Sequence, residues 1–204
     1  MKQKDNTLNS IQDIRNIMEK STKFSSLSGL SFIAAGIVAT ISALFAAYTL
    51  DSNILTFNLY KPISIEQLYK LIGNGIITLI LASVVAYIFT KIKAAKLKHS
   101  LNSVISRHLF LHLAIPLLTG GIIVLSLIYH GNLVLVAPLL LISYGLGVVS
   151  ASKFTHAEIF YLGIIHLVLG CIGLFALGNG LILWTLGFGL THIIWGIYFY
   201  KKHD

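Results

Sequence analysis

The chain has 204 residues, of which 56% are apolar and only 11% are charged, and its formal net charge is +8. Soluble domains carry about 25% charged residues, so this composition excludes an ordinary soluble protein and predicts one embedded in a lipid bilayer. The positive balance does not call for nucleic acid, because cations that flank membrane spans contact anionic lipid headgroups. We therefore expect the lipid bilayer, and no nucleic acid, as a partner.

The first 26 residues are polar and amphipathic. Their apolar residues recur every three to four positions, which predicts an amphipathic helix: Leu8, Ile11, Ile14, Ile17 and Met18. Such a helix is an interfacial anchor on the inner leaflet or a contact for a cytosolic or membrane protein partner. The segment lacks the apolar core and cleavage site of a signal peptide, so we expect it to be retained. We divide the chain into a cytoplasmic segment, 1–26, and a transmembrane domain, 27–204.

Six apolar stretches follow, each long enough to cross about 30 Å of hydrocarbon as a helix. They cover approximately residues 27–50, 71–90, 109–129, 133–150, 159–177 and 181–200. The predicted fold is therefore all-α, an integral membrane protein with six transmembrane helices.

The cations predict how these spans are oriented. Of the 15 Lys and Arg residues, all but Lys61 and Lys70 fall on one side of the predicted spans. Loops rich in Lys and Arg stay in the cytoplasm. Both termini are therefore expected in the cytoplasm.

Short polar motifs predict where two helices begin. Ser64-x-x-Gln67 and Thr155-x-x-Glu158 both have the spacing of a capping box, in which the two side chains satisfy free backbone amides.

Span one carries a small residue at every fourth position, a pattern typical of close helix packing: Ser31, Ala35, Ala39, Ala43 and Ala47. This face could meet another span or a second copy of the chain, which leaves a homo-oligomer open.

The last two spans share the motif G-x-x-H-x-x-x-G, whose spacings place its residues on one helical face. The two copies are Gly163, His166, Gly170 and Gly189, His192, Gly196. Each histidine lies twelve positions from a turn at residues 178–180. An antiparallel hairpin would therefore place the two histidines at the same depth, with glycine opposite glycine.

Ionisable groups inside a membrane are often functional, and four interpretations of these histidines remain open. They can form a packed, hydrogen-bonded pair, in which Gly163, Gly170, Gly189 and Gly196 serve as packing positions. They can bind haem as axial cofactor ligands, although the short turn counts against the separation that haem needs. His112, His166 and His192 can together bind zinc or copper. The same imidazoles can also carry protons or a small solute.

Three stretches of the chain resemble a family. The first comprises Ile14 to Ser21 followed by Leu27 to Ser31, and the others run from Ala137 to Lys153 and from Gly187 to His192. Together they resemble a group of six-span inner-membrane proteins of Bacteroidetes-type bacteria that has no assigned activity. The resemblance implies a fold and a location, but no catalytic residues.

The motifs favour a non-enzymatic function. The spans contain neither paired acids nor a nucleophile next to a base, so no catalytic residue is assigned. The leading hypothesis is a scaffold, sensor or partner subunit. The alternatives are a metal- or haem-binding membrane protein that uses the intramembrane histidines, and an oligomeric small-solute or proton pathway.

Overall fold

The structure, a computed structural model, describes residues 23–51, 63–98 and 100–204. These residues form helices and their connections, without a strand. The amphipathic helix predicted for the N-terminal segment falls almost wholly within residues 1–22, outside the described residues.

Six helical segments are long and apolar enough to cross a membrane, as predicted. The first three are α2 (Gly29–Thr49), α3 (Ile65–Lys96) and α4 (Val104–Tyr129). The fourth consists of η1 (Leu133–Leu135), α5 (Val136–Ala151) and η2 (Ser152–Phe154), and the fifth is α6 (Glu158–Phe175). The sixth consists of α7 (Gly180–Trp184), η3 (Thr185–Thr191) and α8 (His192–His203). The protein thus has the helices of a multi-pass membrane protein.

Polar side chains define the starts of three of these helices. Ser64 and Gln67 form the predicted capping box before α3, with both reciprocal hydrogen bonds present. Ser28 accepts a hydrogen bond from the amide of Leu30, and Ser103 accepts one from the amide of Ser106. Each cap satisfies a backbone donor that would otherwise lack a partner at the helix end.

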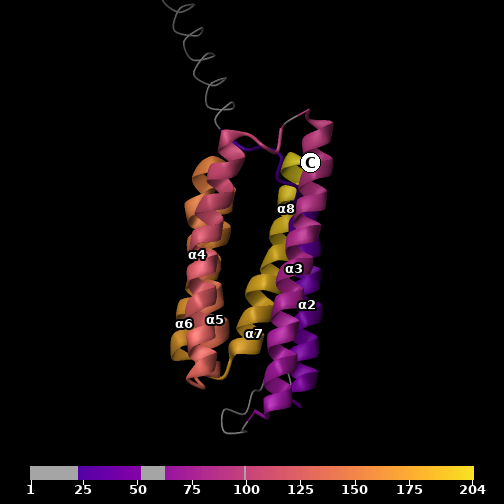
Figure 1. Ribbon diagram of the computed structural model, residues 1–204. Coiled ribbons are helices and arrows are strands. Elements are labelled where there is room, and N and C mark those ends of the chain that lie inside the picture. The colour runs from indigo at the N-terminus through magenta and orange to yellow at the C-terminus, as the bar shows by residue number, and fades with distance from the viewer. Residues whose placement is uncertain (1–22, 52–62, 99) are drawn as a thin grey trace, which may run out of the picture.

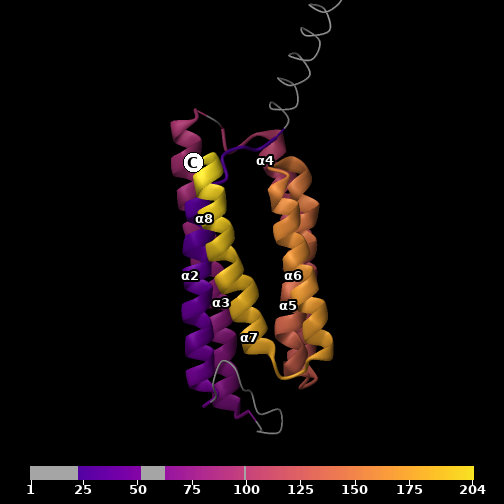
Figure 2. The ribbon, with the colours of Figure 1, turned by 180° about the vertical axis from the view of Figure 1, so that it is seen from behind.

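The helices form two groups of three (Figures 1 and 2). α2 packs against α3 and α8, whereas α5 packs between α4 and α6. The chain returns from the second group to the first through α7 and η3, which touch α5 and α6 as well as α2. The last two spans, predicted to form a packed hairpin, therefore belong largely to different groups.

Glycines allow close approach within each group. A Cβ atom on Gly163 of α6 would lie 2.8 Å from the amide nitrogen of Val149 and 2.9 Å from the carbonyl oxygen of Gly145, both on α5. A Cβ on Gly196 of α8 would lie 2.8 Å from the carbonyl oxygen of Gly29 on α2. Because lipid tails are as apolar as the helices, such close packing is a main source of helix association in a bilayer.

An apolar core joins the two groups. The ring of Phe199, on α8, is fully buried among Val148 of α5 and Ile159 and Leu162 of α6. Phe32 of α2 meets the same ring edge to face, with centroids 5.5 Å apart. Phe199 is thus the apolar anchor that connects α8 to the opposite group.

We expect Gly163→Ala to destabilise the protein although alanine is the better helix former. The added methyl group would meet the α5 backbone, which cannot move as a flexible side chain can, at a cost of about 1–3 kcal/mol of unfolding free energy. Gly121→Ala is the matched control, because a Cβ there meets nothing within 4 Å. Thermal unfolding in detergent compares the two variants, and equal midpoints would contradict close packing at Gly163.

Candidate functional site

The structure brings the two intramembrane histidines together. His166 of α6 is fully buried and His192 of α8 is 4% exposed. Their ring centroids lie 4.9 Å apart with the planes 80° to one another. Each is contributed by a different helix group, so the pair lies at the junction of the two groups.

The hydrogen bonds define the tautomer of both rings. Nδ1 of His166 lies 2.8 Å from the carbonyl oxygen of Leu162, and Nδ1 of His192 lies 3.1 Å from that of Gly187. A carbonyl only accepts, so Nδ1 carries the hydrogen in both rings and each neutral ring keeps its lone pair on Nε2. The Tyr144 hydroxyl donates to Nε2 of His192 over 2.8 Å. Nε2 of His166 is buried and has no hydrogen-bond partner among the described residues.

Aromatic rings surround the pair. The centroid of Tyr144 lies 4.8 Å from that of His166 and 5.3 Å from that of His192. Phe188 contacts the same two rings, at 5.4 and 6.1 Å, and also stands 4.6 Å from Trp184. A haem bound between two histidines needs a free lone pair on each. Tyr144 occupies that of His192, and its ring packs where a cofactor would approach.

The backbone before His192 is unusual. Residues Thr185–Thr191 form the π-helix η3, and such wide turns inside α-helices often occur at functional sites. Side chains bond to carbonyls five residues earlier: Thr191 Oγ1 donates to Leu186 over 2.7 Å, and His192 donates to Gly187. Sequence reasoning missed this element, in which Gly187 and Gly189 lie between Thr185 and Thr191.

The other predicted site residues lie apart from the pair. His112 is exposed on α4, where its Nδ1 lies 2.8 Å from Ser150 Oγ and its ring packs on Phe154. It does not join His166 and His192 in a three-ligand cluster. The four motif glycines do not face one another across a hairpin. Gly163 and Gly170 contact α5, whereas Gly189 and Gly196 contact α2.

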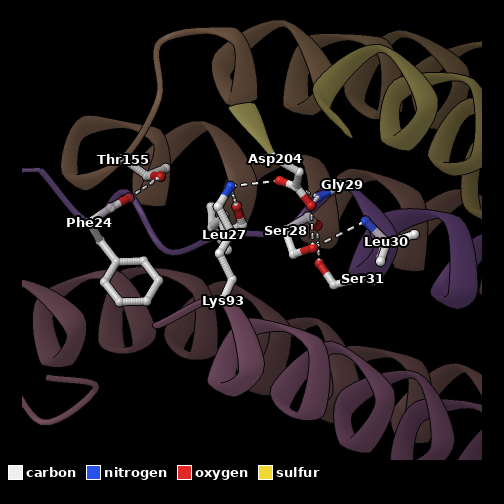
Figure 3. A network of polar contacts seen from close by, with 9 residues as sticks. All are labelled: Phe24, Leu27, Ser28, Gly29, Leu30, Ser31, Lys93, Thr155 and Asp204. Atoms are coloured by element: carbon white, nitrogen blue, oxygen red, sulfur yellow. Dashed lines mark hydrogen bonds and ion pairs between the residues drawn. The ribbon is translucent and has the colours of Figure 1, made fainter. Parts of the chain in front are cut away.

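A polar network ties the chain together at the end where α8 stops (Figure 3). The carboxylate of Asp204 accepts hydrogen bonds from Lys93 Nζ at 2.6 Å, from Ser28 Oγ at 2.6 Å and from the Gly29 amide at 3.1 Å. Lys93 also donates to the Leu27 carbonyl over 2.7 Å. Burial raises the pKa of Asp204, but these hydrogen bonds outweigh it and hold the pKa below its usual value. The network thereby joins α3 and α8 to the start of α2.

The segment before α2 extends this network to the second helix group. The amide of Phe24 donates to the Phe154 carbonyl over 2.7 Å, and Thr155 Oγ1 donates to the Phe24 carbonyl over 2.8 Å. Figure 3 shows the bond between Thr155 and Phe24 near the Asp204 network. Residues 24–28 thus connect both groups at one end of the molecule.

The capping box predicted at Thr155 and Glu158 was wrong. α6 begins after Ala157 without a side-chain cap. Thr155 bonds to Phe24 instead, and the Glu158 carboxylate pairs with the Lys202 ammonium of α8. Both side chains bind residues that are distant in the sequence, so they do not cap the start of α6. Nearby, burial lowers the pKa of His156.

Comparisons with protein-family models, with curated proteins and with solved structures found no match. What the protein does must therefore be inferred from its own residues.

We expect Asp204→Asn to lower the unfolding free energy by about 2 kcal/mol, because it leaves the largely buried Lys93 ammonium without its counter-ion. The side chains of Lys93 and Asp204 are only 11% and 10% exposed. Adding Lys93→Met to Asp204→Asn should recover part of the loss, since no unpaired charge then remains. Lys96→Met, on the exposed face of α3, is the control. Thermal unfolding of Asp204→Asn, Lys93→Met, the double variant and Lys96→Met measures this coupling, and strictly additive losses in the double variant would contradict it.

Proposed function

We propose that the protein is a non-enzymatic component of a bacterial inner membrane, a scaffold, sensor or partner subunit. In this proposal both ends of the chain lie in the cytoplasm. The N-terminal segment, as an amphipathic helix, contacts the inner leaflet or a protein partner there. Membership in the inner-membrane group that the sequence resembles is part of the same proposal.

The proposal rests on the hydrogen bonds that the two intramembrane histidines make within the protein. Three of their four ring nitrogens bind partners within the protein: two bind backbone carbonyls and one binds Tyr144. Buried polar groups paired in this way join helices. A catalytic base would instead need an approach for a substrate, and the packed rings of Tyr144 and Phe188 occupy the surroundings of the pair.

The distribution of charge supports the orientation. Lys93 and Lys202 both pair with carboxylates at the end of the molecule where α3 and α8 stop and α4 begins. The cation-rich residues 91–98 and 100–107 lie at that same end, whereas Lys70 lies near the start of α3 at the other. Positive residues favour the cytoplasmic side of a membrane.

The central test replaces His192 and, separately, Tyr144, which donates a hydrogen bond to it. We expect His192→Ala to lower the unfolding free energy by about 2–4 kcal/mol, since it opens a buried cavity and leaves Tyr144 without an acceptor. Tyr144→Phe should cost about 1 kcal/mol, a typical value for a hydrogen bond between membrane helices. The control is Tyr161→Phe, because Tyr161 is 62% exposed.

The same samples separate a packed pair from a cofactor site. Under the proposal, the visible absorption spectrum and the metal content of His192→Ala equal those of the wild type. A Soret band, or a stoichiometric metal, that disappears in His192→Ala would overturn the packed pair and favour a cofactor protein.

Cysteine labelling tests the orientation. In a Cys171→Ser background, we place single cysteines at Ser100→Cys and Asn132→Cys, at opposite ends of α4. In intact spheroplasts, a membrane-impermeant maleimide should label Asn132→Cys and should reach Ser100→Cys only after lysis. The reverse pattern would place the cation-rich end outside and contradict the proposal.

One observation favours a second candidate, a proton or small-solute pathway in an oligomer. The unpaired Nε2 of His166 stands beside the Tyr144 and His192 pair, so a proton acceptor lies next to a hydrogen-bonded chain. Proteoliposomes decide between the two functions. A proton flux that is abolished by His166→Ala would replace the scaffold with a pathway.

A further inference from the structure

The strongest unexplained cluster lies where α8 ends beside the start of α6. It contains His156 from the connection before α6, Glu158 from the first turn of α6, and His203 from the last turn of α8. One ligand atom from each side chain lies within 4.8 Å of the other two, the only such triad of potential metal ligands in the described part of the chain. These residues are separate from the intramembrane pair and from every site that the sequence predicted.

Two of the three groups lack a partner for their ligand atom. Nε2 of His156 and Nε2 of His203 are both buried, and neither makes a hydrogen bond with a described residue. Nε2 of His203 lies 3.5 Å from Glu158 Oε1, too far for a good hydrogen bond. Buried polar atoms without partners are rare in native proteins, and an ion that is not represented is one of the accepted explanations.

The rings are held in place by groups other than these nitrogens. The imidazoles of His156 and His203 have centroids 4.0 Å apart, and Phe199 packs on both, at 5.1 and 4.5 Å. His156 also makes a hydrogen bond with the backbone of Ser25. Because its Nε2 is unpaired, this bond must involve Nδ1 and leaves the Nε2 lone pair available. Outer contacts of this kind orient metal-binding histidines.

The geometry points to a site for a divalent transition metal, zinc by its ligand set, formed by His156, Glu158 and His203. Two imidazole nitrogens and one carboxylate oxygen are a recognised set of three protein ligands for zinc, and the fourth position goes to water. Ligands about 2.0–2.1 Å from a tetrahedral zinc stand roughly 3.3 Å apart. The His203 and Glu158 atoms already have nearly this separation, and all three ligand atoms lie within 4.8 Å of one another.

Lys202 is the competitor for this site. Its ammonium pairs with Oε1 of Glu158, the same oxygen that faces His203. A carboxylate has two oxygens, so it can coordinate a metal and accept a hydrogen bond from an ammonium at the same time. The two cations would nevertheless repel one another. The side chains of Glu158 and His203 are about one-fifth exposed, at 20% and 18%, so an ion can reach them from the aqueous side.

A metal here would clamp the two helix groups together. His203 belongs to α8 of the first group, whereas His156 and Glu158 belong to the start of α6 in the second. An ion that binds the folded protein alone stabilises it in proportion to the logarithm of its concentration over its Kd. This role is structural and goes beyond the proposed function without depending on it.

The test is a zinc titration of the full chain, purified in detergent without a histidine tag and stripped by a chelator. Competition with a chromophoric zinc indicator should reveal one equivalent of zinc per chain and a raised thermal midpoint. His203→Gln should weaken binding at least about 100-fold, since loss of even an outer contact costs 10- to 100-fold. His130→Gln, at the turn after α4, is the matched control and should bind as the wild type does.

A second variant keeps the proposal falsifiable if His203→Gln fails to fold. Lys202→Gln retains all three ligands and removes the competing ammonium, so it should tighten zinc binding by about tenfold. Lys201→Gln makes the same change of charge on an exposed neighbour and should have little effect. No zinc bound by the wild type, full binding by a folded His203→Gln, or no difference between Lys202→Gln and Lys201→Gln would overturn the site.

Discussion

Helices inside a bilayer gain little from hiding apolar surface, because lipid tails are as apolar as they are. Association must come from close packing and from polar groups that find partners within the protein. Within the helix groups, glycines allow close packing of α5 with α6 and of α2 with α8, and the Asp204 network adds polar contacts to the first group. Between the groups the protein uses both kinds of contact, through the ring of Phe199 and the hydrogen bond of Tyr144 to His192.

The polar contacts between the groups lie at two depths. In the interior, the Tyr144 hydroxyl of α5 reaches His192 of α8, and the second imidazole stands beside them. At the end where α8 stops, Glu158 of α6 pairs with Lys202 of α8, and Thr155 donates a hydrogen bond to the Phe24 carbonyl ahead of α2. The π-helix η3 lies just before His192 in the last span. The backbone of this span therefore departs from the α-helical form where the span passes from one helix group to the other.

Whether a short sequence motif forms its predicted local contact depends on whether a distant residue binds the same side-chain atoms more strongly. The capping box of Ser64 and Gln67 forms although Gln67 also has a distant partner, because its Nε2 donates to the Thr49 carbonyl while its Oε1 remains available to the Ser64 amide. The equivalent pattern at Thr155 and Glu158 fails because Phe24 and Lys202, distant in the sequence, take both side chains. The spacing of the motif glycines was likewise a true sign of close packing, but the partners are α5 and α2.

The sequence by itself determined the class of the protein and the number of its spans, because hydrocarbon thickness demands about 20 apolar residues per helix. It also singled out His166 and His192, since ionisable residues are conspicuous in such stretches. Only the tertiary structure decided that the last two spans separate into different groups, and which ring nitrogens of the two histidines are paired. It alone assembled His156, Glu158 and His203, because a cluster from two helices depends on how those helices cross, and no local pattern encodes that.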